Sequence, residues 1–143
     1  MRIAINASFW DSPTTGSGQY TRRLVEGLAA LDVNLQIILV IPTDRKQGAG
    51  SREQEVVCPA SCILHPVSCP RSHLGKVWFE QVTFPRACVR LGADVAHVPY
   101  WAPPLTPSIP TVVTIHDLIP LVLREYRGGP LVRLYTALVS TAT

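Results

Sequence analysis

Two groups of residues in this chain have types and spacing that suit chemistry, and each follows an apolar run. The first is Gly16-Ser17-Gly18, which ends a polar loop after the apolar run MRIAINA. The amphipathic segment QYTRRLVEGLAAL follows it directly. Backbone N–H groups at a helix start are unpaired and carry partial positive charge, so such a loop suits a phosphate. The second is His116-Asp117, which ends the run TVVTIH. A histidine there can donate a hydrogen bond to a ligand hydroxyl or act as a base.

The glycine pair admits three interpretations: a phosphate contact, a simple turn, or part of a dinucleotide fingerprint. The fingerprint G-x-G-x-x-G needs a third glycine where Thr21 stands. It also needs an acidic residue after the second strand, and here Pro42 follows Ile41. A nicotinamide-dependent enzyme is therefore disfavoured, and the absence of Gly-Lys-Ser/Thr excludes a P-loop.

His116 and Asp117 also have a purely structural interpretation, since either side chain can form hydrogen bonds that cap or stabilise a loop. Neighbouring residues of a strand point to opposite faces, so Asp117 need not orient the imidazole. No Asp-x-Asp occurs, and no group of His, Cys and Asp has metal-ligand spacing. We expect no metal cofactor.

Alternating strands and helices must position these residues. Short apolar runs predict strands at 2–7, 35–41, 94–98 and 111–116, with a further short strand at 56–57. Helical spacing and end signals predict helices after Gly18, over 73–91 with a kink or split at Pro85 and a cap at Gly92, and from Leu131 to the end. The segment 59–70 reads as irregular and 99–110 as a proline-rich loop. This order indicates an α/β fold, an open, doubly wound parallel sheet with helices on both faces. Both chemical groups then lie at carboxyl ends of strands, where such sheets bind ligands.

The bulk composition favours one globular domain in the cytoplasm. The chain has 143 residues, 47% of them hydrophobic and 16% charged, and it has neither an apolar run long enough to span a membrane nor a signal peptide. A net charge of +3 is too small and scattered to indicate nucleic acid. The four cysteines lack zinc spacing and are expected to be reduced thiols. The basic segment 73–91 carries Trp78 and Phe79, which suit either a membrane surface or the core.

Five stretches together give the chain a family likeness: MRIAINA, TGSGQYTRRLVEGL, VWFEQVTFP, ADVAHVPYWAPP and PTVVTIHDLIPL. With these stretches in this order, the chain resembles the N-terminal domain of a family 4 (group 1) glycosyltransferase with the GT-B fold. That fold has two Rossmann-like domains with the active site in the cleft between them. The resemblance implies transfer of a sugar from a nucleotide-sugar donor with retention of configuration, usually without a metal.

The resemblance also implies roles for particular residues. The loop at Gly16 and Gly18 would approach the donor diphosphate, and His116 would contact the donor sugar near the reacting carbon. Because the N-terminal domain mostly binds the acceptor, Tyr100, Trp101 and Asp117 become candidates for contacting a sugar or lipid-linked acceptor. Aromatic side chains in the loop 99–110 suit that role, and packing of the loop explains them equally well. Peripheral contact with the inner face of a membrane fits such an acceptor.

The chain departs from the family pattern in length. Family members carry a C-terminal donor-binding domain with two glutamates in an E-x7-E motif, and no two glutamates here have that separation. Residues 1–143 are therefore expected to form an incomplete, acceptor-side domain that transfers little or nothing alone. The alternative is a stand-alone Rossmann-like domain that binds a ligand or a partner without catalysis.

Overall fold

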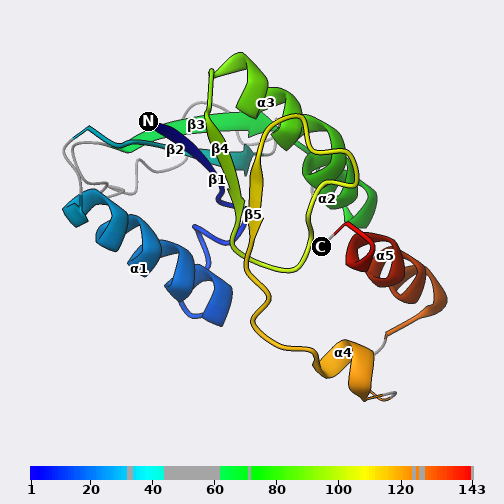
Figure 1. The fold of residues 1–143 in the computed structure, drawn as a ribbon. Helices are drawn as coiled ribbons and strands as arrows, with labels where there is room; N and C mark the ends of the chain where they lie inside the picture. The colour runs from blue at the N-terminus through cyan, green and yellow to red at the C-terminus, as the bar shows by residue number, and fades with distance from the viewer. Residues whose placement is uncertain (32–33, 44–61, 71, 124, 126–127, 143) are drawn as a thin grey trace.

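The computed structural model describes residues 1–31, 34–43, 62–70, 72–123, 125 and 128–142 (Figure 1). The elements in chain order are β1 Arg2–Asn6, α1 Gly16–Leu31, β2 Gln36–Thr43, β3 Cys62–Ser68, α2 His73–Trp78, the π-helix η1 Phe79–Thr83, α3 Phe84–Arg90, β4 Val95–Val98, β5 Thr111–Val113, α4 Ile119–Val122 and α5 Pro130–Ser140.

The five described strands form one parallel sheet in the order β3-β2-β1-β4-β5. The chain therefore runs outward from β1 in one direction and, after β3, returns to its other side, which is the doubly wound arrangement. This confirms the α/β, Rossmann-like fold expected from the alternating pattern. The expected strand at 56–57 lies outside the described residues.

Both faces of the sheet are covered, because successive strand residues point to opposite sides. Ile3, Ile5, Ile37 and Leu39 join Val25 of α1 in one apolar cluster. Ala4, Val40 and Val98 join Phe79, Phe84 and Cys88 in the other, beneath η1 and α3. Figure 1 shows α1 on one side of the sheet and the α2-to-α3 segment on the other.

β2 and β3 differ from the prediction because each contains a proline. Proline has no backbone N–H to donate, and in both strands it lies where no neighbouring strand requires that hydrogen bond. Pro42 was expected to end β2, yet β2 continues to Thr43. It pairs with β1 only as far as Val40, and beyond that point with β3 alone. The segment 59–70 was expected to be irregular, yet it contains β3 with Pro66 inside it. β3 pairs with β2 only, and an edge strand tolerates proline.

The predicted helix over 73–91 is helical but carries a π-helical segment in its middle. The Phe84 N–H bonds to the Phe79 carbonyl, and Pro85, which has no N–H to donate, opens α3. The wider turn shifts the buried stripe to Phe79, Glu80 and Phe84. Trp78 and Leu74, which precede that turn, are exposed, so Trp78 does not face the core. Gly92 does end the helix, with φ of 61°.

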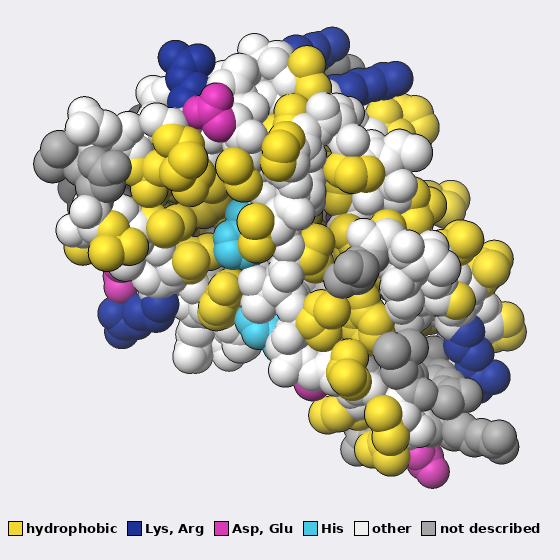
Figure 2. Space-filling view, viewed as in Figure 1, with side chains coloured by type: hydrophobic (Ala, Val, Ile, Leu, Met, Phe, Trp, Pro, Cys, Tyr) yellow, Lys and Arg dark blue, Asp and Glu magenta, His cyan; other side chains and the backbone are white. Residues whose placement is uncertain are grey.

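The carboxyl-terminal part of the chain is less buried than the sheet. β5 ends at Val113, three residues earlier than predicted, because its partner β4 meets Pro99. α5 begins at Pro130, one residue before the expected start, and ends at Ser140. Exposed apolar side chains gather over α4 and α5, as Figure 2 shows at the lower right: Leu118, Ile119, Val122, Leu123, Leu131, Val132, Leu134 and Leu138.

The cysteines only partly match the expectation of reduced thiols. Cys69 and Cys88 are buried thiols. Cys62, in β3, is disulfide-bonded, so the expectation is wrong for this residue. Spacing alone carried no signal for that bond.

Candidate functional site

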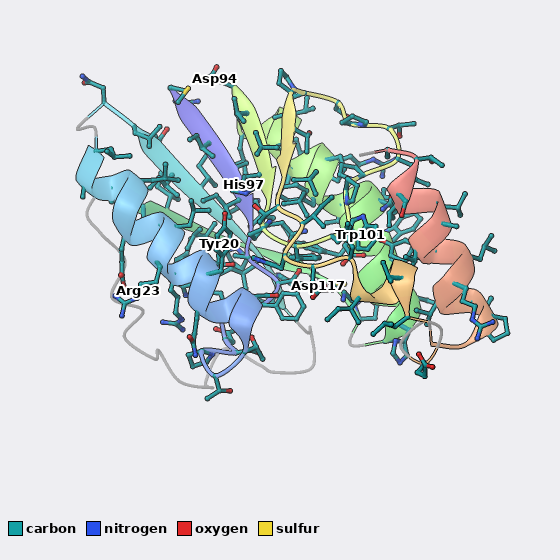
Figure 3. The ribbon with its side chains drawn as sticks, turned by 60° about the horizontal axis from the view of Figure 1, so that its bottom comes forward. Tyr20, Arg23, Asp94, His97, Trp101 and Asp117 are labelled. Carbon is teal, nitrogen blue, oxygen red and sulfur yellow. The ribbon has the colours of Figure 1, made fainter. Side chains whose placement is uncertain are left out.

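The chain adds β2 and β3 on one side of β1 and then β4 and β5 on the other. The segments that follow the neighbouring strands β1 and β4 therefore diverge at the carboxyl ends of these strands. Ligands of doubly wound folds bind at this edge. Figure 3 brings the edge forward and labels residues of the sheet, α1 and the loops around it. Three segments meet here: the β1 loop from Ala7, the β4 loop from Pro99, and the chain from Thr114 onward.

His116 lies three residues beyond β5 and is held by two contacts. Its Nε2 lies 3.0 Å from the Pro99 carbonyl oxygen. A carbonyl oxygen can only accept, so Nε2 carries the proton and donates. The ring also packs edge-to-face against Tyr20 of α1, with ring centres 4.8 Å apart. In the neutral ring Nδ1 is then an acceptor on an exposed side chain, free to meet a ligand hydroxyl.

Thr114 connects the histidine to the sheet through a hydrogen-bonded network. Its hydroxyl lies 2.9 Å from Nε2 of His97 and 3.1 Å from the Tyr20 hydroxyl. Burial lowers the pKa of His97, so this imidazole tends to remain neutral. Sequence reasoning missed all three residues as supports. The alternation of β4 and β5 places His97 and Thr114 on one face, which is a usable signal.

The start of α1 carries the two glycines at which a phosphate contact is expected. The Thr15 side chain caps the helix, accepting from the Gly18 N–H at 3.1 Å. The space beside Gly18 is filled, because a Cβ there would lie 2.1 Å from the Ser12 carbonyl oxygen. Gly16 has open space beside it. Tyr20 follows one turn later, so the same helix carries both the open glycine and the ring against His116.

Tyr100 is buried rather than presented to solvent, being only 7% exposed. Its hydroxyl donates to Ser8 Oγ at 3.2 Å, and its ring packs edge-to-face against Phe9. Burial, followed by the nearby charge of Glu80, raises the pKa of Tyr100 well above its usual value. Trp101 is half-buried, and its indole N–H has no hydrogen-bond partner in the described part of the chain.

Asp117 is exposed, and one carboxylate oxygen accepts from the Ile119 N–H at 3.0 Å. It therefore braces the start of α4, and its second oxygen makes no hydrogen bond with another described residue. The structure brings His116, Tyr20 and Pro99 together, whereas Tyr100 faces the other way, toward Ser8 and Glu80.

Glu80 is the buried group that sequence reasoning passed over. The residue is 1% exposed, and its Oε2 accepts from the Tyr135 hydroxyl at 2.5 Å. Lys76 Nζ lies 3.8 Å from Oε1. Burial raises the pKa of Glu80, and the Tyr135 hydrogen bond and the Lys76 charge oppose that rise. Gln81, next in η1, ties Pro103, Leu105 and Tyr135 together. Glu80 is the one acidic residue of the basic segment 73–91, which was the available signal.

Among the described residues, no three histidine, cysteine, aspartate or glutamate side chains gather closely enough to hold a metal ion. In the part of the chain that the structure describes, no helix combines the length and apolar character needed to cross a bilayer.

The chain is similar to a known protein family. The model of Glycosyltransferase Family 4 matches residues 14–142. The matched range contains α1 with Gly16 and Gly18, the η1 segment, and the chain from β4 to His116. No curated protein and no solved structure matches the chain.

Proposed function

Because the chain belongs to Glycosyltransferase Family 4, we propose that it is the acceptor-side domain of a retaining, hexosyl-transferring enzyme that uses a nucleotide sugar as donor. Membership of the family implies a sugar donor and an acceptor in general. The retaining course, the nucleotide and the hexose are our proposal, as is a reaction without a metal or other cofactor. The domain supplies one wall of the cleft, and a donor-binding domain supplies the other.

The observation that carries this proposal is the fixed orientation of His116. Its Nε2–H is committed to the Pro99 carbonyl, so Nδ1 is the atom left for a substrate. There it accepts a hydrogen bond from a donor-sugar hydroxyl and orients the sugar for attack. The Tyr20 ring prevents the imidazole from turning away.

The start of α1 supports a donor phosphate in the same place. The Thr15 cap occupies the Gly18 N–H, and no described residue bonds the N–H groups of Gly16 and Ser17. With open space at Gly16, a diphosphate oxygen can reach both groups at the positive end of the helix dipole. Gly18 serves the packing of the loop against the helix, and it supports the site indirectly.

For the acceptor, Trp101 and the second oxygen of Asp117 are the proposed contacts. The half-buried ring of Trp101 can pack against an acceptor sugar, and the Asp117 oxygen can accept a hydrogen bond from an acceptor hydroxyl. Tyr100 acts through Ser8 and the loop that it supports. The acceptor is a sugar or lipid-linked molecule, and we place the enzyme in the cytoplasm with peripheral contact at the inner membrane face.

The test uses the full-length form that the coding frame specifies. It is incubated with nucleotide hexoses and candidate acceptors, and the anomeric configuration of the product is read by NMR. Transfer with retention, and its loss in His116→Ala, is the expected result. Inversion, or full activity in His116→Ala, overturns the mechanism. Ligand binding without any transfer favours the stand-alone binding domain. We expect residues 1–143 alone to transfer little or nothing.

A further inference from the structure

A pocket opens on the α2 side of the β1 loop, with a volume of about 500 Å³. It lies at the carboxyl ends of β1, β2 and β3 against the start of α2, and its lining includes Ser8, Phe9, Asp11, Ser72, His73 and Lys76. Pro99 and Tyr20, which hold His116, are not part of it. The pocket is thus distinct from the histidine site and from the acceptor contacts named above.

Lys76 is the cation of this pocket and is held in place from several sides. Its Nζ lies 5.3 Å from the ring centre of Phe9 and 5.7 Å from that of Tyr100. The nearest carboxylate oxygen, Glu80 Oε1, is 3.8 Å away, which is too long for a hydrogen bond. About half of the side chain is exposed. Its ammonium donors are therefore available to a ligand in the pocket.

The carboxyl group of Glu80 lies on the buried side of the Lys76 ammonium. The carboxyl group is fully buried, and Tyr135 of α5 holds its Oε2. Oε1 has no hydrogen-bond partner and faces Lys76. The π-helical turn that begins at Phe79 gives the helix its departure from regular geometry at this point, and such turns often mark functional sites. The cation and its buried counter-charge are thus built into the helix.

The balance of charge decides which class of ligand fits. Lys76 contributes one positive charge, and Asp11 in the same wall opposes it. Counting histidine as neutral at pH 7, the described residues that line the pocket have no surplus of positive charge, whether Glu80 is ionised or not. A phosphate would gain no net attraction from these two side chains, because the charge of Asp11 offsets that of Lys76. A neutral ring bearing hydroxyls suits the wall better, since Lys76 donates, Asp11 accepts, and the Phe9 ring packs against C–H groups.

We propose that this pocket binds a neutral carbohydrate ring, with Lys76 donating to its hydroxyls and Asp11 accepting from them. The inference rests on the proposed function only in identifying this ring as part of the acceptor. It predicts an acceptor whose recognised sugar carries no phosphate or carboxylate. Binding itself can be measured without transfer.

The test is NMR titration of the isotope-labelled chain with methyl α-glucoside, methyl α-galactoside and methyl α-mannoside. At least one glycoside should shift the amide signals of Ser8, Asp11 and Lys76. Lys76→Met and Asp11→Asn should each weaken that binding by about tenfold or more, because each removes a charged hydrogen-bonding group. Both side chains are exposed enough for the variants to fold. Arg90→Met, which removes an exposed cation at the end of α3, should bind as wild type does.

Three results overturn the proposal: no glycoside shifts these signals, glucose 1-phosphate shifts them when no neutral glycoside does, or both variants bind as wild type does. The outcome for the proposed function is read separately. If the full-length enzyme transfers a sugar from a nucleotide sugar but no glycoside binds in this pocket, the inference is wrong and the proposed function stands. If a glycoside binds here but the enzyme transfers no sugar, the inference stands and the proposed function is wrong.

Discussion

The imidazole of His116 and the phenol ring of Tyr20 meet edge to face, with ring centres 4.8 Å apart and planes inclined by 80°. The hydrogen bond from His116 Nε2 to the Pro99 carbonyl, at 3.0 Å, fixes the remaining rotation of the ring. The two contacts come from α1 and from the end of β4. The direction of Nδ1 therefore depends on how α1 packs on the sheet, and a substrate meets an acceptor that is already oriented.

Removing the imidazole should therefore slow transfer without unfolding the domain. In the full-length enzyme we expect His116→Ala to lower kcat by about 100-fold, the usual range for a group that acts on the reacting centre. Tyr20→Phe is the matched control, since it keeps the ring against His116 and loses only the hydroxyl bond to Thr114. It should retain nearly full kcat and lose about 1 kcal/mol of stability. Equal turnover in His116→Ala and wild type would remove this residue from the chemistry.

The two glycines at the start of α1 should respond differently to a methyl group. A Cβ at Gly18 would lie 2.1 Å from the Ser12 carbonyl oxygen and 2.8 Å from that of Phe9. The loop must move to admit it, so Gly18→Ala should lower the free energy of unfolding by about 1–3 kcal/mol. Gly16 has nothing within 4 Å, so Gly16→Ala should change stability by less than about 0.5 kcal/mol. Urea unfolding of both variants measures this, and equal stabilities would contradict the packing role of Gly18.

A larger side chain at Gly16 tests the phosphate contact itself. We expect Gly16→Val to raise the donor KM in the full-length enzyme, because the added bulk occupies the approach to the Gly16 and Ser17 N–H groups. Gly27→Val is the control, since it also adds a branched side chain to an open position of α1, three turns from the site. If Gly16→Val has the same donor KM as the Gly27→Val control, the proposed phosphate contact at Gly16 is wrong.

Much of the fold was predictable because its strands are short, apolar and β-branched. Runs such as that of β2 indicate strands buried on both faces, and the strand-helix alternation leads to a doubly wound parallel sheet. The prediction was wrong for the end of β2 and for the existence of β3, because both strands contain a proline. Pro42 and Pro66 are tolerated because each lies where a strand has a partner on one side only. That depends on strand order, which no local pattern contains.

The helix from His73 to Arg90 misled the prediction for a different reason. The adjacent residues Phe79 and Glu80 of the π-helical turn are both buried, whereas the apolar residues Leu74 and Trp78 before it are exposed. Apolar spacing at 3.6 residues per turn predicts neither. At the site, the position of His116 near the carboxyl end of β5 was foreseeable from the sequence, although the strand ends three residues before it. Its contacts with Tyr20 and Pro99 were not, because they join segments that meet only after folding.

The buried carboxyl of Glu80 makes a prediction about pH. Burial raises its pKa above the ordinary value of 4.5 in the folded chain, so the folded state holds this proton more tightly than the unfolded state does. Stability must then fall as pH rises from about 4.5 through the raised pKa, and this contribution is constant above it. Glu80→Gln keeps the shape of the side chain and cannot ionise. Its stability relative to wild type should therefore increase with pH across that window.

Tyr135→Phe separates this titration from loss of packing. The Tyr135 hydroxyl stabilises the carboxylate through its bond to Oε2, so its removal should raise the pKa of Glu80 further and extend the fall in stability to higher pH. Urea unfolding of the wild type and both single variants between pH 4.5 and 8 gives the three curves. The double variant should lack the extended fall, since no carboxyl remains to titrate. If the difference between wild type and Glu80→Gln does not vary with pH, ionisation of Glu80 does not affect the stability of the fold.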